Sequence, residues 1–124
     1  MKSYFYLLLL VLLSCQTQKA KSTLTGNCFS FDQRQCQADD FASLIKANTQ
    51  QDLFAGMTTY LTNNGILVQH IRIDMEYHEV VCDACEICPE HHRFFVSINP
   101  EDIAELQNLN LFHLESISCA DYFE

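Results

Sequence analysis

The most regular alternation of apolar and polar residues in this chain lies between positions 70 and 78. Every second residue there is apolar, the set being Ile71, Ile73, Met75 and Tyr77. A period of two predicts a β-strand with one buried and one solvated face. Residues 93–98 repeat the pattern, with Phe94, Val96 and Ile98 as the inward set. We expect the two segments to form an antiparallel hairpin that places Tyr77 near Val96 and Met75 near Ile98.

Three further segments carry helix signals. The first follows Asp39 and Asp40, whose charges favour a helix N-terminus, and its apolar face would hold Phe41, Leu44 and Ile45. The third opens at Asn99, a residue suited to the N-cap, with Pro100 in the first turn. We expect this third helix to turn Ile103 and Leu106 toward the sheet.

The second helix is predicted from Gln51 to about Asn63. Thr49 and Asp52 resemble a capping box at its start, and Gly65 supplies a left-handed residue just beyond its end. Its buried stripe would consist of Leu53, Met57, Tyr60 and Leu61.

A last strand, with poorer alternation, is predicted over residues 111–118. The expected order is therefore helix, helix, strand, strand, helix, strand. This order indicates an α+β fold, in which a small antiparallel sheet of about three strands carries two to three helices on one face. The connection between the hairpin strands contains several cysteines, so we expect disulfides to stabilise the fold.

The N-terminus shows a different pattern. A charged residue, Lys2, is followed after one position by ten consecutive apolar residues from Tyr4 to Leu13, and a small residue, Ser14, stands directly before Cys15. Such a charged start, apolar run and small-residue site predict an export signal over residues 1–14. The motif Leu12-Leu13-Ser14-Cys15 resembles the lipobox of bacterial lipoproteins. In that family the cysteine is lipidated and becomes the new N-terminus, so the resemblance implies lipidation at Cys15.

The resemblance also implies a location. Gln16 after the cysteine implies sorting to the outer membrane, and the polar residues after it make 15–27 a flexible tether. A permanent transmembrane helix is disfavoured, since ten residues span about 15 Å of a hydrocarbon core that is roughly 30 Å thick. Ordinary secretion, with cleavage a few residues after Cys15, is the remaining alternative.

Charge narrows the choice of partner. All sixteen acidic residues lie beyond position 31, and removal of Lys2 with the signal leaves six basic residues, for a net charge of −10. Nucleic acid is excluded as a partner, because phosphate binding needs clustered Lys and Arg. Residues 28–124, beyond the tether, have the length and apolar content of a single globular domain.

Cysteine usage agrees with export. Six cysteines remain after Cys15, an even number that predicts a disulfide framework: Cys28, Cys36, Cys82, Cys85, Cys88 and Cys119. Sequence alone does not fix their pairing. Cys28 with Cys36 is the natural local pair, and one cysteine of the 82–88 loop is expected to reach Cys119.

The same loop is the one candidate for chemistry. Copper or zinc could bind there if the thiols were reduced, with ligands drawn from Cys82, Cys85, Cys88, His91 and His92. A thiol-redox role is the related alternative, although the acidic neighbours would raise a thiol pKa. Iron–sulfur and haem motifs do not fit, because Pro89 and His92 stand where those motifs need other residues.

No catalytic constellation is visible elsewhere. His70 and His78 lie on the predicted solvated face of one strand, about 26 Å apart, and His113 stands alone in its segment. The carboxylates are dispersed and are expected to form an acidic surface. The leading hypothesis is therefore a non-enzymatic, membrane-anchored lipoprotein of the cell envelope, acting as an interaction or accessory module toward another envelope protein. The metal-handling or thiol-redox protein is the alternative.

Overall fold

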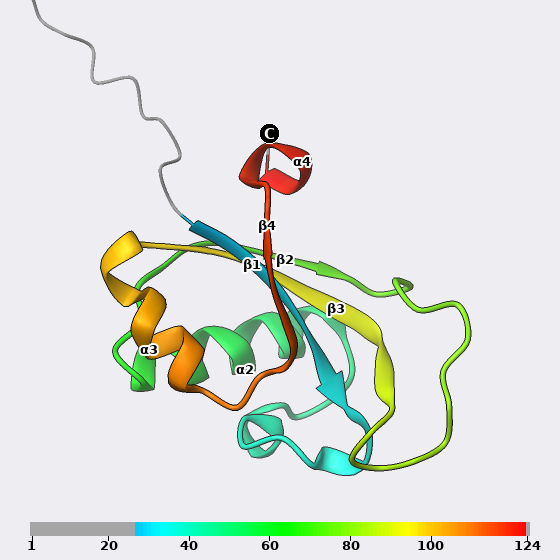
Figure 1. Cartoon of the computed structure of the whole chain (residues 1–124). Helices are drawn as coiled ribbons and strands as arrows, with labels where there is room; N and C mark the ends of the chain where they lie inside the picture. The colour runs from blue at the N-terminus through cyan, green and yellow to red at the C-terminus, as the bar shows by residue number, and fades with distance from the viewer. Residues whose placement is uncertain (1–26, 124) are drawn as a thin grey trace, which may run out of the picture.

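A four-stranded antiparallel sheet organises residues 27–123, which are the residues that the computed structural model describes (Figure 1). Its strands, in the order β2-β3-β1-β4 across the sheet, are β2 (Val68–Asp74), β3 (Pro89–Ile98), β1 (Asn27–Arg34) and β4 (Phe112–Ile117). Together with its helices and disulfides, this sheet confirms the α+β fold. The predicted signal peptide, Cys15 and the tether before Asn27 lie outside the described residues.

The strand that prediction missed is β1, at the centre of the sheet. It pairs with β3 on one side and β4 on the other, both antiparallel. Phe29 and Phe31 alternate there with Ser30 and Asp32, which is itself a period-two signal. Strands flank both of its edges and other parts of the chain cover both of its faces, so even its polar residues Ser30 and Asp32 are buried.

The best-predicted helix is α2 (Gln50–Asn63). The backbone N–H of Asp52 donates to Thr49 Oγ1 at 3.2 Å, and Thr49 Oγ1 donates to the Asp52 carboxylate at 3.0 Å, so the expected cap is present. Gly65 takes a left-handed φ of 76° just past the end. The residues that α2 buries are Leu53, Gly56, Met57 and Leu61.

The helix predicted after Asp39 is not formed. In its place is one short 3-10 turn, η2 (Ala42–Leu44), and a second such turn, η1 (Gln35–Gln37), comes before Asp39. Asp39 turns back instead of capping a helix, since its carboxylate accepts from the Arg34 backbone N–H and from Arg34 Nη1, both at 2.6 Å. The aspartate therefore closes the loop that comes after β1.

The hairpin of β2 and β3 has the expected faces but another register. Ile71 lies opposite Val96 and Ile73 opposite Phe94, so the predicted pairing of Tyr77 with Val96 is wrong by six residues. The strand ends at Asp74, whose Oδ1 accepts from the Glu76 backbone N–H at 3.1 Å and starts a turn. Met75 and Tyr77 therefore leave the sheet.

The main core fills one face of the sheet. Phe29, Phe31, Phe94, Val96 and Ile98 pack there against buried side chains of α2 and against Leu106 of α3 (Ile103–Asn108). This α3 comes after the turn η3 (Pro100–Asp102), at the place where sequence predicts the third helix. Figure 1 shows α2 running across the strands. No helix within residues 27–123 is long and apolar enough to cross a membrane.

The opposite face has a smaller cover. Phe95 of β3 stacks on Tyr122 of α4 (Cys119–Phe123), with ring centroids 4.5 Å apart, and Tyr77 contacts the same Phe95 ring at 5.9 Å. A disulfide between Cys28 and Cys119 fixes α4 to the start of β1. Every residue of β3 from His92 to Ile98 is consequently buried, including those that alternation assigns to the solvated face.

Candidate functional site

All six cysteines that remain after Cys15 form disulfides, which confirms the predicted framework. The pairs are Cys28–Cys119, Cys36–Cys85 and Cys82–Cys88. The expected local pair of Cys28 with Cys36 is wrong, because extended β1 separates these residues by roughly 25 Å, far beyond the reach of a disulfide. The expectation that a loop cysteine reaches Cys119 is also wrong. Cys28 lies opposite Ile117 in the sheet, which brings the nearby Cys119 to it instead.

Two of these disulfides brace the segment between β2 and β3. One closes a ring over residues 82–88, and the other fixes Cys85 to Cys36 in η1. Three hydrogen bonds add to the bracing: Cys88 N–H donates to Ala84 O at 3.0 Å, Gln35 N–H to Cys88 O at 3.0 Å, and Gln35 Nε2 to Cys82 O at 2.7 Å. This segment, residues 79–88, is hereafter the braced loop.

The braced loop presents apolar and acidic side chains to solvent. Val80 is 89% exposed and Ile87 is 73% exposed, whereas Cys88 at its base is buried. Its charged residues are all acidic: Glu79, Asp83 and Glu86, each of them exposed. No Lys or Arg occurs anywhere between Arg72 and Arg93. The braced loop is thus an apolar and acidic surface on a rigid base.

The side chains proposed as metal ligands do not converge. His91 Nδ1 donates to His78 O at 2.8 Å, while His92 lies 3% exposed on the core face and donates from Nε2 to Gln33 Oε1 at 2.9 Å. Burial lowers the pKa of His92 to about 4, so the ring is neutral near pH 7. Among residues 27–123, no group of three or more His, Cys, Asp or Glu side chains is arranged to hold a metal ion. While the disulfides persist, the thiolates that copper or zinc prefers are absent.

A buried carboxylate that sequence reasoning missed lies next to the braced loop. Asp32 of β1 is fully buried and accepts from His78 Nε2 at 2.8 Å, from His113 Nδ1 at 2.9 Å and from Arg93 Nη1 at 2.8 Å. Burial raises its pKa, but hydrogen bonds from His78, His113 and Arg93 and the charge of Arg93 prevail, so the pKa lies below its usual value. His78, expected at the solvated surface, and His113, expected to stand alone, share this one partner.

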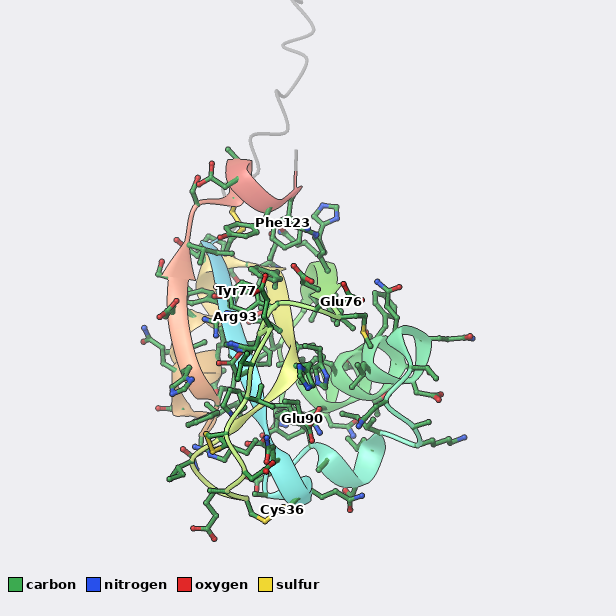
Figure 2. The ribbon with its side chains drawn as sticks, turned by 90° about the vertical axis from the view of Figure 1, so that its right-hand side faces the viewer. Cys36, Glu76, Tyr77, Glu90, Arg93 and Phe123 are labelled. Atoms are coloured by element: carbon green, nitrogen blue, oxygen red, sulfur yellow. A yellow bond between two sulfur atoms is a disulfide. The ribbon has the colours of Figure 1, made fainter. Side chains whose placement is uncertain are left out.

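Arg93 is the fourth member of a polar cluster that also contains Asp32, His78 and His113. Its Nη2 donates to Ser30 Oγ at 2.9 Å, to His113 O at 3.2 Å and to Glu115 Oε2 at 3.0 Å, and its guanidinium lies 5.2 Å from the centre of the Tyr77 ring. Figure 2 shows Tyr77 and Arg93 side by side. A guanidinium cannot accept a proton, so it does not activate Ser30 as a nucleophile. The cluster joins β1, β3 and β4 to the chain segment that leads into the braced loop.

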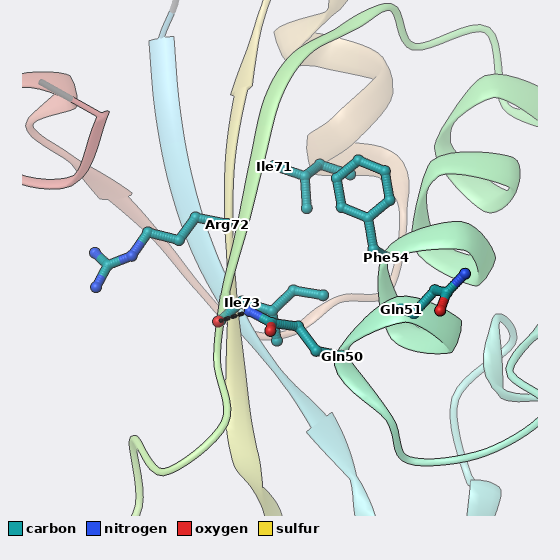
Figure 3. A pocket seen from close by; sticks show the side chains of 6 residues that line it. All are labelled: Gln50, Gln51, Phe54, Ile71, Arg72 and Ile73. Carbon is teal, nitrogen blue, oxygen red and sulfur yellow. Dashed lines mark hydrogen bonds between the residues drawn. The ribbon is translucent and has the colours of Figure 1, made fainter.

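A shallow pocket lies between α2 and the free edge of β2 (Figure 3). Phe54, which is 48% exposed, faces Ile71 across it, and Arg72 points away. Gln50 Nε2 donates to Ile73 O at 3.3 Å and so covers one carbonyl of the edge strand. This contact blunts the edge against the addition of another strand. The lining residues are Gln50, Gln51, Phe54, Ile71, Arg72 and Ile73.

No protein-family model, curated protein or solved structure matches this chain.

Proposed function

We propose that this protein is a non-enzymatic lipoprotein of the bacterial cell envelope, held to a membrane by lipid on Cys15 and acting as an interaction or accessory module. The observation that carries this proposal is the motif Leu12-Leu13-Ser14-Cys15 at the end of an apolar run. Gln16 favours the outer membrane as the site of the anchor. Two or more acyl chains, as the family's modification supplies, give stable anchoring.

The disulfides support an exported location. Every one of the six cysteines after Cys15 is paired, and such pairing persists in the oxidising environment outside the cytoplasm. With the anchor set aside, no sulfur of residues 27–123 is left as a free thiol for metal or redox chemistry. The polar cluster around Asp32 supports a non-enzymatic role, since each contact described for it joins two parts of the fold.

The anchor is tested by replacing Cys15. In the wild-type chain we expect membrane fractionation and incorporation of labelled fatty acid. Cys15→Ala should abolish the label and leave the signal uncleaved. Cys28→Ala/Cys119→Ala, which removes two later cysteines, is the matched control and should keep the label. A wild-type chain that is cleaved, unlabelled and recovered in the soluble fraction would show ordinary secretion and overturn the proposal.

The metal-handling or thiol-redox alternative is separated by counting thiols. Alkylation of the exported protein without reductant should modify none of its six later cysteines. Two or more modified cysteines among Cys82, Cys85 and Cys88, together with bound copper or zinc in native mass spectrometry, would favour the alternative.

A further inference from the structure

The braced loop combines two properties that favour a binding role. Its backbone from Cys82 to Cys88 is fixed at both ends and in the middle, by the disulfide Cys82–Cys88 and by the bond from Cys85 to Cys36, and Val80 stands two residues before this ring. It nevertheless exposes two β-branched apolar side chains, Val80 and Ile87, far more than a core would allow. Apolar side chains held out on a rigid support are typical of a contact surface for another molecule.

Val80 and Ile87 lie close enough in the braced loop for one partner to reach both. The Cα atoms of Cys82 and Cys88 are 5.4 Å apart. Val80 stands two residues before Cys82, and Ile87 one residue before Cys88. With about 3.8 Å between successive Cα atoms, Val80 and Ile87 lie within roughly 17 Å of each other. One partner surface can therefore contact both.

The charges of the braced loop select the kind of partner. Glu79, Asp83 and Glu86 are all exposed, and the stretch between Arg72 and Arg93 contains no basic residue to neutralise them. A second copy of this strongly acidic chain would be repelled, and so would an anionic membrane surface. A partner surface with an apolar recess would match the exposed Val80 and Ile87, and Lys or Arg around that recess would match the acidic side chains.

The position of the loop agrees with contact away from the anchor. β1 starts at Asn27, next to α4, and ends at Arg34, which lies opposite Pro89 at the base of the braced loop. Figure 2 shows Cys36 and Phe123 at opposite ends of the sheet. The eight residues of β1 place the braced loop roughly 25 Å from the point where the tether joins the fold. An anchor attached before Asn27 would hold the opposite end of the sheet.

We propose that the braced loop is a protein-recognition surface, and that its partner is an envelope protein with an apolar recess bordered by Lys or Arg. Val80 and Ile87 enter the recess, and Glu79, Asp83 and Glu86 meet its basic rim. This inference rests on the proposed function and gives it a partner class. Since the disulfides have already ordered the loop, little conformational entropy is lost on binding. Full burial of an Ile side chain predicts that Ile87→Ser weakens the contact roughly tenfold to a hundredfold.

Photo-crosslinking in cells that carry the full-length chain tests the inference. Benzoylphenylalanine at position 87 should give a discrete protein adduct, and the same probe at Gln107, an exposed site on α3, should not. Asp83→Lys/Glu86→Lys should abolish the adduct, whereas Glu101→Lys/Glu105→Lys, at exposed acidic sites outside the loop, should retain it. The crosslinked peptide of the partner should contain or adjoin Lys or Arg.

Several outcomes would overturn the inference. They are no adduct, an adduct to lipid, an adduct with the mass of two copies of this chain, or one that survives charge reversal in the loop. Lipid on Cys15 is measured in the same cells. A lipidated chain that gives no charge-dependent adduct refutes the recognition surface alone, and an unlipidated chain refutes the proposed function. Thermal melting of each variant confirms that exposed substitutions have left the fold intact.

Discussion

Replacing His92 should make the stability of this protein less dependent on pH. His92 is 3% exposed, contacts the Phe94 ring edge-on at 5.4 Å and donates a hydrogen bond to Gln33. Burial lowers its pKa from 6.5 to about 4 in the folded protein. The unfolded chain therefore takes up a proton as the pH falls through 6.5, while the folded protein resists protonation until about pH 4.

The sign of the effect is set by linkage. Because the unfolded state binds more protons between pH 6.5 and 4, the free energy of unfolding must fall as the pH falls through that window. The full difference in pKa corresponds to about 3 kcal/mol, most of which is lost by pH 4.5. Asp32 acts in the same direction only at lower pH. Its folded-state pKa is depressed, so its stabilising effect is complete above the unfolded value near 3.8 and is lost as the pH falls through the folded value.

Urea unfolding of the oxidised protein at pH 7.5 and pH 4.5 measures this effect. Between pH 7.5 and pH 4.5, the free energy of unfolding of the wild-type protein should fall by roughly 2 to 3 kcal/mol more than that of His92→Gln. Glutamine retains a hydrogen-bond donor for Gln33 but does not titrate. His70→Gln, at an exposed histidine, is the matched control and should behave like the wild type. Equal losses in the wild type and His92→Gln would refute the assignment of a buried, neutral His92.

Three further predictions concern stability and use urea unfolding at pH 7.5. Asp32→Asn should lower the free energy of unfolding by about 3 to 5 kcal/mol, because it removes the buried charged partner of Arg93 and leaves only the exposed Glu115. A loss below about 1 kcal/mol would contradict the cluster. Replacing Cys28 and Cys119 by alanines should lower the free energy of unfolding by about 5 kcal/mol, and replacing Cys82 and Cys88 should lower it by about 2 kcal/mol. The reason is loop length, since the first disulfide closes a loop of 91 residues and the second closes a loop of 6. A larger loss for the second pair would contradict this entropic explanation. Gly56→Ala should lower the free energy of unfolding by about 1 to 3 kcal/mol, because a Cβ at this position would lie 2.8 Å from Leu44 O. An unchanged urea midpoint would show that the surrounding backbone relaxes to make room for it.

The features that sequence predicted correctly depend on neighbouring residues. The N-cap of α2 is formed by Thr49 and Asp52, three residues apart, and the helix ends just before Gly65, which has a positive φ. Alternation along 93–98 identified the core face of β3, where Phe94, Val96 and Ile98 are fully buried. An even cysteine count predicted that all six later cysteines form disulfides. Each of these signals is local or compositional.

The features that escaped prediction depend on residues far apart in the chain. Asp32 meets His78 across 46 positions and His113 across 81, so no spacing rule could join them. The disulfide pairing depends on β1, an extended strand that separates Cys28 from Cys36 and was not recognised. The hairpin register was set by the turn at Asp74, whereas alternation alone continues through Tyr77. Alternation defines faces, and the turn defines where pairing stops.

The intact mass of the mature protein, purified from membranes without reductant, tests the central claim most directly. A lipid-anchored module predicts a chain that begins at Cys15, carries the mass of its acyl chains and gains no mass on alkylation. A chain that begins beyond Cys15 and carries no lipid would contradict the anchor.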